Sequence, residues 1–310
     1  MNYNKIILVT RKTRLEGLIK QFNTREQARF YIEHNGGDFN FYIREHDVYF
    51  KALDQLHTQL KSISKLHMIE RSFLPNFLFS DKDVVVTIGI DGLVVNTAKY
   101  LDGQPIIAVN PDPQNIDGIL LPFNVSQGVK AVQRTMEGKH NFQPISMAQA
   151  TLQDGQSLLA FNDLFIGVNN HTSARYQITS GRRSENQSSS GIIISTGAGF
   201  TGWLSSFINM TNGLLKFSGD EETAPLSYPQ LPWDTDKLFF IVREPFISKT
   251  SRASIVCGYI DSQNELILES HTPSDGVIFS DGIASDFLAF NSGSIVKIKT
   301  ANKRTILVTT

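Results

Sequence analysis

The stretch DVVVTIGIDGLVVNTAKYL, residues 83–101, joins two apolar segments through a short loop. Its first part is a run of β-branched residues, which is typical of a buried strand. The loop Gly89-Ile90-Asp91-Gly92 follows, and a second apolar pattern begins after it. In an open α/β sheet, ligands bind just beyond the carboxyl ends of the strands. We therefore expect Asp91 to lie at a binding site, where Gly89 and Gly92 let a ligand approach the main chain.

The segments around this stretch predict an α/β domain. KIILVT at residues 5–10 and QPIIAVN at 104–110 are further candidate strands, and helical spacing occurs over residues 23–34 and 42–63. Short apolar runs that alternate with helices are typical of a parallel sheet covered on both faces. We assign residues 1–125 to this nucleotide-binding domain, with the C-terminal tail, about residues 290–310, as a candidate addition.

Residues 126–290 show a different pattern. Short runs of strand-forming residues follow one another, separated by turn residues, which predicts a β-rich domain with two sheets. The segment 126–139 is expected to form a helix that joins the two domains, starting from a cap at Ser126. The polar segment 178–191 is expected to be a loop or a hairpin tip.

The composition excludes several classes of protein. The 310 residues include 29 basic and 30 acidic side chains, and this balance argues against a duplex nucleic-acid binder. The apolar run at residues 6–10 is too short for a signal peptide or a membrane span, so we expect a cytoplasmic protein without membrane partners. The single cysteine, Cys257, forms no internal disulfide and is expected to be buried. The seven histidines show no metal-like pairing.

A carboxylate at the start of a helix needs an explanation. The helix N-terminus favours an anion such as phosphate, which Asp91 would repel. Asp91 could instead hold a magnesium ion or accept a proton from a hydroxyl about to attack. The alternative is an Asp-Gly turn in which Asp91 caps its own helix. Asn110 and Asp112, after the third strand, are further candidates for the same pocket.

Two later stretches carry polar groups in apolar surroundings. Asn162 and Asp163 interrupt an apolar strand, where an amide and a carboxylate are costly unless they are paired or bind a ligand. Residues 189–206 form a strand that ends in a glycine-rich loop with hydroxyls and Trp203, a composition that suits a nucleoside. A polar strand end and a tight hairpin are the structural alternatives.

Taken in order, these stretches resemble the NAD kinase family, the enzymes that phosphorylate NAD to NADP. The motifs that carry the resemblance run from Val84 to Ile283 and are Gly89–Gly92, Asn162 with Asp163, Thr196–Trp203, and Asp281 with Gly282. The resemblance implies the fold described above, an α/β domain followed by a β-rich one. It also implies phosphoryl transfer, in which positioning and charge stabilisation provide most of the acceleration.

By this resemblance Asp91 is the general base or the carboxylate that organises a metal, and it acts on the 2'-hydroxyl of the adenosine ribose of NAD. The resemblance implies a magnesium-bound nucleoside triphosphate such as ATP as the donor, with polyphosphate as an alternative, and a homodimer or homotetramer. No residue is assigned as a metal ligand. The residues it implies for nucleotide and dinucleotide binding are Gly89, Gly92, Asn162, Asp163, Thr196, Gly197, Thr201, Gly202, Trp203 and Ser206.

Three residues depart from the family pattern. Ile90 replaces the second glycine of the first motif, Leu93 stands where many members have threonine, and Phe200 stands where serine is common. These departures keep open a catalytically silent sensor that binds a nucleotide or dinucleotide, and a kinase of the same superfamily with another acceptor, such as a lipid. A dehydrogenase is a weaker alternative. Gly197, Gly199 and Gly202 match G-x-G-x-x-G, with acidic residues at 220–222, but the sequence around these acidic residues contains no second strand to complete the βαβ unit.

Overall fold

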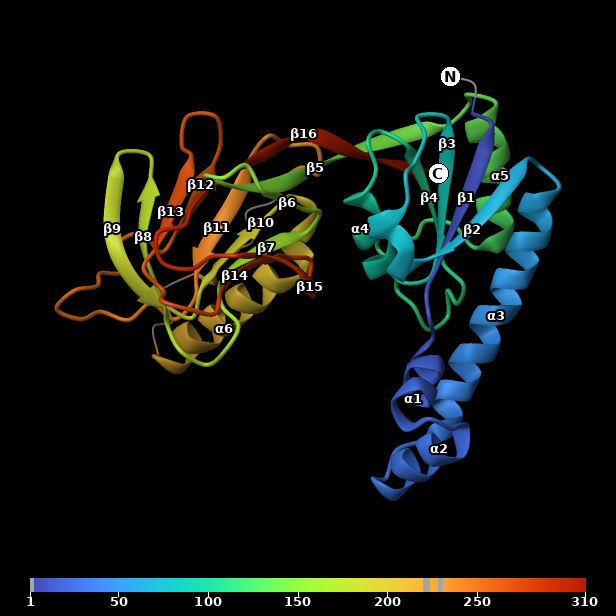
Figure 1. The fold of residues 1–310 in the computed structure, drawn as a ribbon, viewed down its shortest axis with the longest axis horizontal. Coiled ribbons are helices and arrows are strands. Elements are labelled where there is room, and N and C mark those ends of the chain that lie inside the picture. The colour runs from blue at the N-terminus through green and yellow to red at the C-terminus, as the bar shows by residue number, and fades with distance from the viewer. Residues whose placement is uncertain (1–2, 220–223, 228–230) are drawn as a thin grey trace. The chain divides into compact units, whose positions relative to one another are not determined.

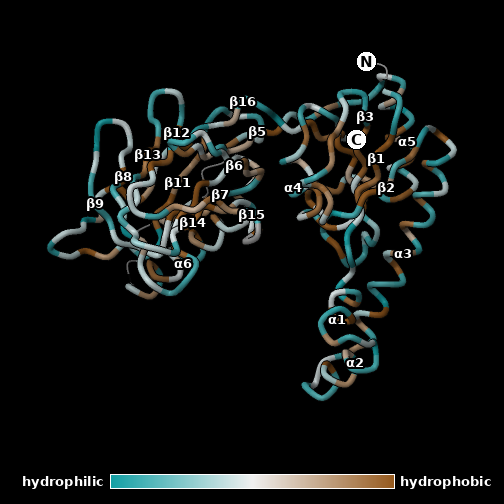
Figure 2. The backbone as a smooth tube through the Cα atoms, in the orientation of Figure 1, coloured by the Kyte–Doolittle hydropathy of each residue, from teal (hydrophilic) through white to brown (hydrophobic). Residues whose placement is uncertain are grey.

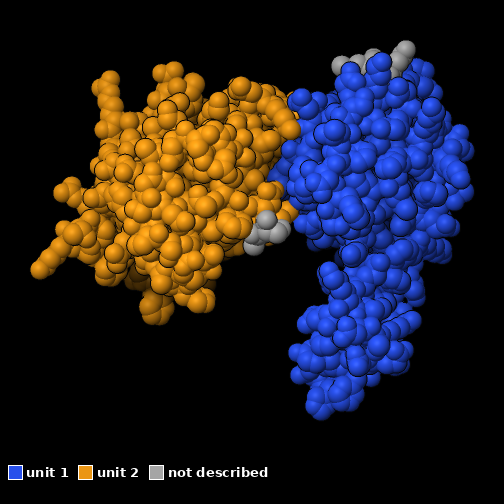
Figure 3. Space-filling model, in the orientation of Figure 1, with its two compact units in different colours: residues 1–143, 305–310 blue, residues 144–304 orange. Residues whose placement is uncertain are grey.

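The computed structural model describes residues 3–219, 224–227 and 231–310. It divides into two compact units (Figures 1 and 3). The first contains residues 1–143 and 305–310, and the second contains residues 144–304.

The first unit is built on a parallel sheet with the strand order β2-β1-β3-β4-β16. Its strands are β1 (Lys5–Thr10), β2 (Lys65–Glu70), β3 (Asp83–Ile88), β4 (Pro105–Val109) and the last residues of β16 (Ile295–Thr309). Every residue of β3 and β4 is buried, as expected for the central strands of a sheet covered on both faces. The expected strands at 5–10, 83–88 and 104–110 are therefore confirmed.

Helices complete the first unit. They are α1 (Arg14–Phe22), α2 (Arg25–His34), α3 (Phe39–Lys61), the 3-10 helix η1 (Arg71–Asn76), α4 (Asp91–Ala98) and α5 (Val125–Met136). The second half of α3 and α5 share an apolar core with the sheet. The helices α1 and α2 pack against the start of α3 through Leu15, Ala28 and Phe39, and this helical lobe is seen below the sheet in Figure 1.

Two details of these helices differ from the sequence-based expectation. The helix α1 was not expected, although Thr13 and Glu16 form a reciprocal capping box at its start. The helix α5 begins one residue earlier than expected, and its cap is Asn124, whose side chain accepts from the Gln127 amide. Ser126 is not the cap, because its hydroxyl donates to the Asn124 side chain.

The second unit contains antiparallel strands in two layers. One layer has the order β16-β13-β8-β9 and the pair β5–β6, from β5 (Asn141–Leu152), β6 (Ser157–Ala160), β8 (Ala174–Ser180), β9 (Arg183–Ser189), β13 (Leu266–Ser270) and the start of β16. The other has the order β12-β11-β10-β7-β14-β15, from β7 (Asp163–Val168), β10 (Ile192–Ser195), β11 (Leu238–Val242), β12 (Cys257–Ile260), β14 (Gly276–Ser280) and β15 (Ile283–Ala289).

The two faces of the six-stranded sheet pack differently. One face joins the other layer in a single apolar core, which includes Leu164, Ile166 and Ile194 (Figure 2). The alternate residues, such as Phe165 and Ile193, point to the outer face and pack against α6 (Trp203–Phe217). The α/β unit and the β-rich two-sheet unit confirm the expected fold class.

The segment 178–191 contains the expected hairpin tip, at residues 181–182 between β8 and β9, but more of it is strand than expected. Residues 183–189 form a regular strand, β9, because Gln187 and Ser189 point inward and both contact the Tyr176 hydroxyl. Hydrogen bonds of 3.0 and 2.7 Å to the Tyr176 hydroxyl therefore satisfy these two polar side chains, which in the sequence are typical of a loop. Cys257 is exposed rather than buried, since it begins the edge strand β12.

Candidate functional site

Asp91 lies at the carboxyl end of β3, as the first residue of α4. The helix cap is Ile90, which makes no side-chain capping bond, so Asp91 does not cap its own helix. Its Oδ1 instead accepts a hydrogen bond from the Leu120 amide at 2.9 Å. No hydrogen bond to Oδ2 is found among the described residues. One oxygen of the carboxylate is thus fixed by the loop after β4, and the other remains able to accept a proton or contact a cation.

A cavity of about 490 Å³ opens at the carboxyl ends of the parallel strands. It is lined by Arg11 after β1, by Ile90 after β3 and by Asp112 after β4, together with Phe41 and Val48 of α3. This volume is typical of a site for a small molecule. The position agrees with the general rule for ligands in open α/β sheets.

Arg11 is the most informative side chain of this cavity, and the sequence analysis did not single it out. It donates from Nη2 to Glu45 Oε1 at 2.9 Å, and its guanidinium lies 5.1 Å from the centre of the Tyr49 ring. Within the described chain, Arg11 Nε and Glu45 Oε2 are buried without a hydrogen-bond partner. Unsatisfied buried polar atoms are uncommon, and a water or a ligand usually completes them.

Gly89 explains how Arg11 approaches the strand end. A Cβ at Gly89 would lie 3.3 Å from both Cδ and Nε of Arg11 and 3.2 Å from Leu93. A larger residue at position 89 would therefore push the guanidinium away from the loop. A Cβ at Gly92 would meet open space, apart from the end of the Ile90 side chain at 4.0 Å.

The two candidates after β4 have different surroundings. Asn110 is buried, donates to the Ile116 carbonyl at 2.9 Å and accepts from the Asp112 amide at 2.9 Å. It therefore stabilises the loop. Asp112 lines the cavity and accepts from the Asn115 amide group at 2.8 Å.

The three departures from the family pattern fall in different places. Ile90 has extended backbone angles, φ −108° and ψ 166°, so its β-branched side chain causes no strain. That side chain is 41% exposed and lines the cavity. Leu93 and Phe200 are both buried, and Phe200 contacts the Phe239 ring edge-on. Only Ile90 changes the shape of the cavity.

The second unit brings its own predicted residues together at the start of β7. Asp281 and Gly282 form the tight turn between β14 and β15, both with positive φ (54° and 70°). The Asp281 carboxylate accepts from the backbone amides of Asn162 at 2.8 Å, Phe161 at 3.1 Å and Asp163 at 3.2 Å. Asp281 therefore holds the Asn162–Asp163 segment in place.

Asp163 is a buried carboxyl group, 7% exposed. Burial, and secondly the negative charge of Asp281, raises the pKa of Asp163 to about 7. No hydrogen bond to its carboxylate is found in the part of the chain that the structure describes. Asp163 is therefore partly protonated near neutral pH and able to donate a hydrogen bond as well as accept one. Asn162, beside it, is half-buried.

The glycine-rich loop after β10 packs onto this segment. The Thr196 hydroxyl donates to the Phe161 carbonyl at 2.6 Å. A Cβ at Gly199 would overlap the Asn162 carbonyl, and one at Gly197 would overlap the Pro232 carbonyl. Both glycines are required by close backbone contacts, and so the motif positions Asn162.

The last part of the motif is more open. Thr201 and Ser206 are exposed, and Gly202 lies over the Asp163 carboxylate, with Oδ2 4.0 Å from where its Cβ would be. The Trp203 ring turns to the outer face of the sheet and stacks on Phe165 at 5.6 Å. Asn162, Asp163, Thr196 and Gly202 are thus grouped, and the Trp203 ring lies beside them on the outer face of the sheet.

The same loop rules out the dehydrogenase fingerprint. β10 pairs antiparallel with both β7 and β11, whereas the fingerprint requires a parallel βαβ unit. The acidic residues 220–222 of that hypothesis lie outside the described residues. The antiparallel pairing of β10 excludes the dehydrogenase fingerprint without them.

Among the described residues, no group of three or more His, Cys, Asp or Glu side chains could hold a metal ion. Within the same ranges, no helix is both long enough and apolar enough to cross a membrane.

Comparisons with known proteins show which solved structures have a similar fold. No family model matches the chain, and no curated protein sequence matches it significantly. The solved structure of an NAD kinase from Archaeoglobus fulgidus in complex with ATP matches with a TM-score of 0.55 and 13% identity, over 97% of this chain and 92% of that one. Yeast NADH kinase complexed with NADH matches with a TM-score of 0.57 and 12% identity, over 100% of this chain and 84% of that one.

These matches confirm the resemblance at the level of the fold. The chain has an NAD kinase-like fold, and its sequence has diverged far from both solved structures.

Proposed function

We propose that this protein is an NAD kinase-like phosphotransferase that transfers a phosphoryl group from a nucleoside triphosphate to the 2'-hydroxyl of the adenosine ribose of NAD. The observation that carries the proposal is Asp91, fixed by the Leu120 amide at the carboxyl end of β3. It follows Ile90, which lines a ligand-sized cavity, in a fold shared with solved NAD and NADH kinases.

Asp91 acts as the proton acceptor in this proposal. Its Oδ1 is held by the Leu120 amide, so the carboxylate has a fixed orientation, and Oδ2 takes the proton of the attacking hydroxyl. Arg11 supplies positive charge at the same strand ends, with an Nε that lacks an acceptor among the described residues. An anionic phosphate oxygen would satisfy that group and be stabilised by it.

A magnesium ion fits the residues present if the phosphates of the donor hold most of it. Mg²⁺ commonly binds proteins through one or two carboxylates and keeps its other ligands as phosphate oxygens and water. As the alternative to its role as proton acceptor, Asp91 would contact the ion through Oδ2, and the ion when bound would neutralise charge on the donor phosphates.

Dinucleotide binding is assigned to the second unit. Asn162 and Asp163 are held by Asp281 and lie next to Thr196 and Gly202. An amide and a partly protonated carboxyl group can together donate to and accept from ribose hydroxyls. The exposed Thr201 and Ser206 are assigned to the same ligand on the resemblance alone, which also supports a homodimer or homotetramer. A cytoplasmic location is part of the proposal.

The second candidate function is a nucleotide or dinucleotide sensor without turnover. Ile90 favours it, because an exposed β-branched side chain occupies part of the cavity where the family has glycine. A kinase of the same superfamily with another acceptor is compatible with the same observation.

The test is a coupled assay for NADP formed from NAD and Mg-ATP. The variant Asp91→Asn keeps an oxygen that can accept from the Leu120 amide, so its fold should be intact while turnover falls by at least about a hundredfold. Asp117→Asn, an exposed carboxylate in the loop after β4, is the matched control and should keep wild-type activity. Near-normal turnover of Asp91→Asn would refute the role of Asp91. An inactive wild-type protein that still binds NAD would favour the sensor.

A further inference from the structure

A further cavity, of about 380 Å³, lies in the second unit, on the sheet with the order β16-β13-β8-β9. Its lining comes from β8 and β9, from the segment 246–251 after β11, and from His271 after β13. None of the residues that the family resemblance assigns to catalysis or to nucleotide binding lines it. The proposed phosphoryl transfer therefore gives this cavity no role.

Three side chains form a row across the outer face of this sheet, whose strands β9, β8 and β13 lie side by side (Figure 1). Tyr176 of β8 points into the core between the two layers, so its neighbour Arg175 points outward. Ser188 of β9 lies directly opposite Arg175 in the antiparallel register. On the other side, the His271 amide donates to the Arg175 carbonyl at 2.7 Å. Because directly opposite residues of antiparallel strands share a face, Arg175 is flanked by Ser188 and His271.

The segment 246–251 closes the cavity at the outer edge of β9. The Phe246 amide donates to the Ser188 carbonyl at 2.8 Å, and the Arg252 amide donates to the Asn186 carbonyl at 2.9 Å. Between these two anchors, the Ser248 hydroxyl oxygen accepts from two backbone amides of its own turn at 3.2 and 3.1 Å. The wall of the cavity is therefore fixed by main-chain hydrogen bonds, and it carries hydroxyl groups.

Arg175 gives the cavity a positive charge. Its side chain is exposed, and no hydrogen bond or ion pair of its guanidinium is found among the described residues. No acidic side chain of the described chain lines the cavity. The carboxylate beside the row is Glu269, which is 47% exposed, lies 3.9 Å from His271 Nε2 and stands opposite Gln177 rather than Arg175. The N–H groups of Arg175 are thus available for an anion.

Phe246 adds an apolar surface next to these hydrogen-bond donors. Its side chain is 64% exposed, and within the described ranges its ring contacts no other ring. The cavity therefore combines a cation, several polar groups and one free aromatic ring, a combination that suits a small organic ligand with an anionic group.

We propose that this cavity binds a phosphomonoester, with its phosphate group on Arg175 and its organic group against Phe246. The guanidinium donates to the phosphate oxygens as a fork, and the Ser188 hydroxyl and a ring N–H of His271 donate from either side. A phosphate is favoured over a carboxylate because donors on three strands surround the anion, and a phosphate offers three terminal oxygens to them.

This ligand is a second one, separate from the dinucleotide. Asp163 and the glycine-rich loop belong to β7 and β10 of the six-stranded sheet, whereas Arg175 lies on the outer face of the other sheet. The inference does not depend on the proposed kinase activity.

Calorimetric titration of the full chain with phenyl phosphate tests the proposal. Saturable binding with a Kd below about 1 mM is expected. Phenol should bind at least about tenfold more weakly because it lacks the anion, and phenyl sulfate should bind more weakly because it carries a single charge. Inorganic phosphate should bind several-fold more weakly, because it has no group to pack on Phe246.

Substitutions locate the site. Arg175→Gln should weaken the binding of phenyl phosphate at least about tenfold. Arg182→Gln, which changes an exposed arginine at the tip of the β8–β9 hairpin, is the matched control and should bind as the wild type does. Phe246→Ser should reduce the affinity for phenyl phosphate to that for inorganic phosphate and leave the latter unchanged. If Arg175→Gln does not fold, Arg175→Lys replaces it, with a smaller loss because lysine lacks the planar fork.

The same affinity in Arg175→Gln as in the wild type, or no saturable binding of phenyl phosphate at millimolar concentration, would overturn the proposal. Tighter binding of phenyl sulfate than of phenyl phosphate would overturn the ligand class. Loss of binding in Arg11→Gln with none in Arg175→Gln would place the probe at the proposed kinase site instead. If the protein does not phosphorylate NAD but binds phenyl phosphate through Arg175, the kinase proposal fails and this inference stands.

Discussion

Replacing Asp163 by asparagine should remove a pH-dependent loss of stability from the second unit. The carboxyl group is 7% exposed, and burial together with the charge of Asp281 raises its pKa from an ordinary 3.8 to about 7. The folded state therefore binds a proton at pH values where the unfolded state has released it. The resulting stabilisation is fully present below pH 3.8 and is lost as the pH rises towards 7.

The magnitude follows from the two pKa values. For each pH unit over which Asp163 is ionised only in the unfolded state, the free energy of unfolding of the wild type falls by about 1.4 kcal/mol. Between about pH 5 and about pH 8, the free energy of unfolding of the wild type should fall by roughly 2–3 kcal/mol relative to that of Asp163→Asn. Asparagine has nearly the same shape as aspartate and does not titrate. Its contribution to the free energy of unfolding is therefore the same at both pH values.

Urea unfolding followed by tryptophan fluorescence measures this difference. Both tryptophans, Trp203 and Trp233, belong to the second unit, so the signal reports that unit alone. Glu265→Gln is the matched control, because it removes an exposed carboxylate from the same unit and should follow the wild type. A difference between wild type and Asp163→Asn that stays constant from pH 5 to pH 8 would refute the assignment of a raised pKa to Asp163.

Two further predictions concern single side chains. Gly199→Ala should destabilise the second unit by about 1–3 kcal/mol, because the new methyl group overlaps the Asn162 carbonyl. Gly213→Ala, in α6 with nothing within 4 Å, should stabilise it by about 0.5–1 kcal/mol, and equal effects of the two in urea unfolding would contradict the packing described for the loop. Ile90→Gly should raise the affinity for Mg-ATP several-fold, because it clears an exposed side chain from the cavity. Calorimetric titration checks this, and an unchanged or lower affinity would show that Ile90 does not restrict the donor.

The parts of the fold that were predicted depend on strong local patterns. The buried runs of β1, β3 and β4 contain almost only apolar and β-branched residues, so their period and length identify them. The position of Asp91 at a strand end followed from the same pattern. β9 could not be predicted this way, because its inward residues Gln187 and Ser189 are polar and depend on the Tyr176 hydroxyl of the neighbouring strand.

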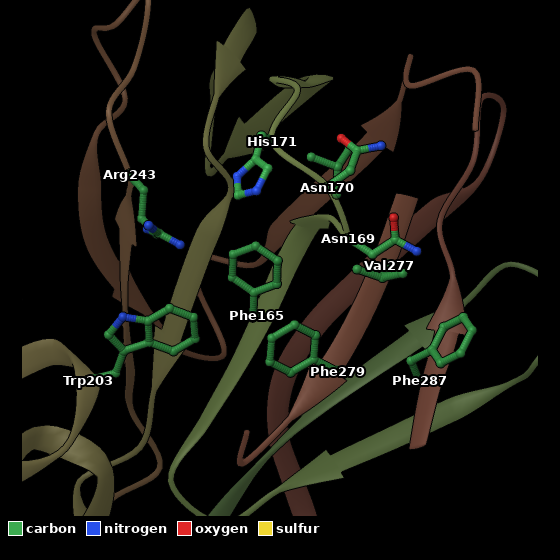
Figure 4. A pocket seen from close by; sticks show the side chains of 10 residues that line it. Phe165, Asn169, Asn170, His171, Trp203, Arg243, Val277, Phe279 and Phe287 are labelled. Carbon is green, nitrogen blue, oxygen red and sulfur yellow. The ribbon is translucent and has the colours of Figure 1, made fainter. Parts of the chain in front are cut away.

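The candidate sites were predicted only in part, for a related reason. The motifs indicated Asn162 and Asp163, but the anchoring of this segment by Asp281 and the raised pKa depend on a contact across about 120 positions in the chain. Arg11 was missed, although a basic residue directly after a buried strand is a usable signal for a strand-end ligand site. A cavity lined by Phe165, Trp203, Arg243 and Phe279 (Figure 4) was missed as well, because these residues come from separate strands and a helix.

The transfer of labelled phosphate from γ-labelled ATP to NAD, with the product identified as the 2'-phosphate, tests the central claim most directly. We expect wild-type protein to form labelled NADP in the presence of magnesium, Asp117→Asn to do the same, and Asp91→Asn to form almost none. Absence of labelled NADP from wild-type protein that is folded and binds both NAD and Mg-ATP would contradict the kinase assignment. Unchanged labelling by Asp91→Asn would contradict the proposed role of its carboxylate.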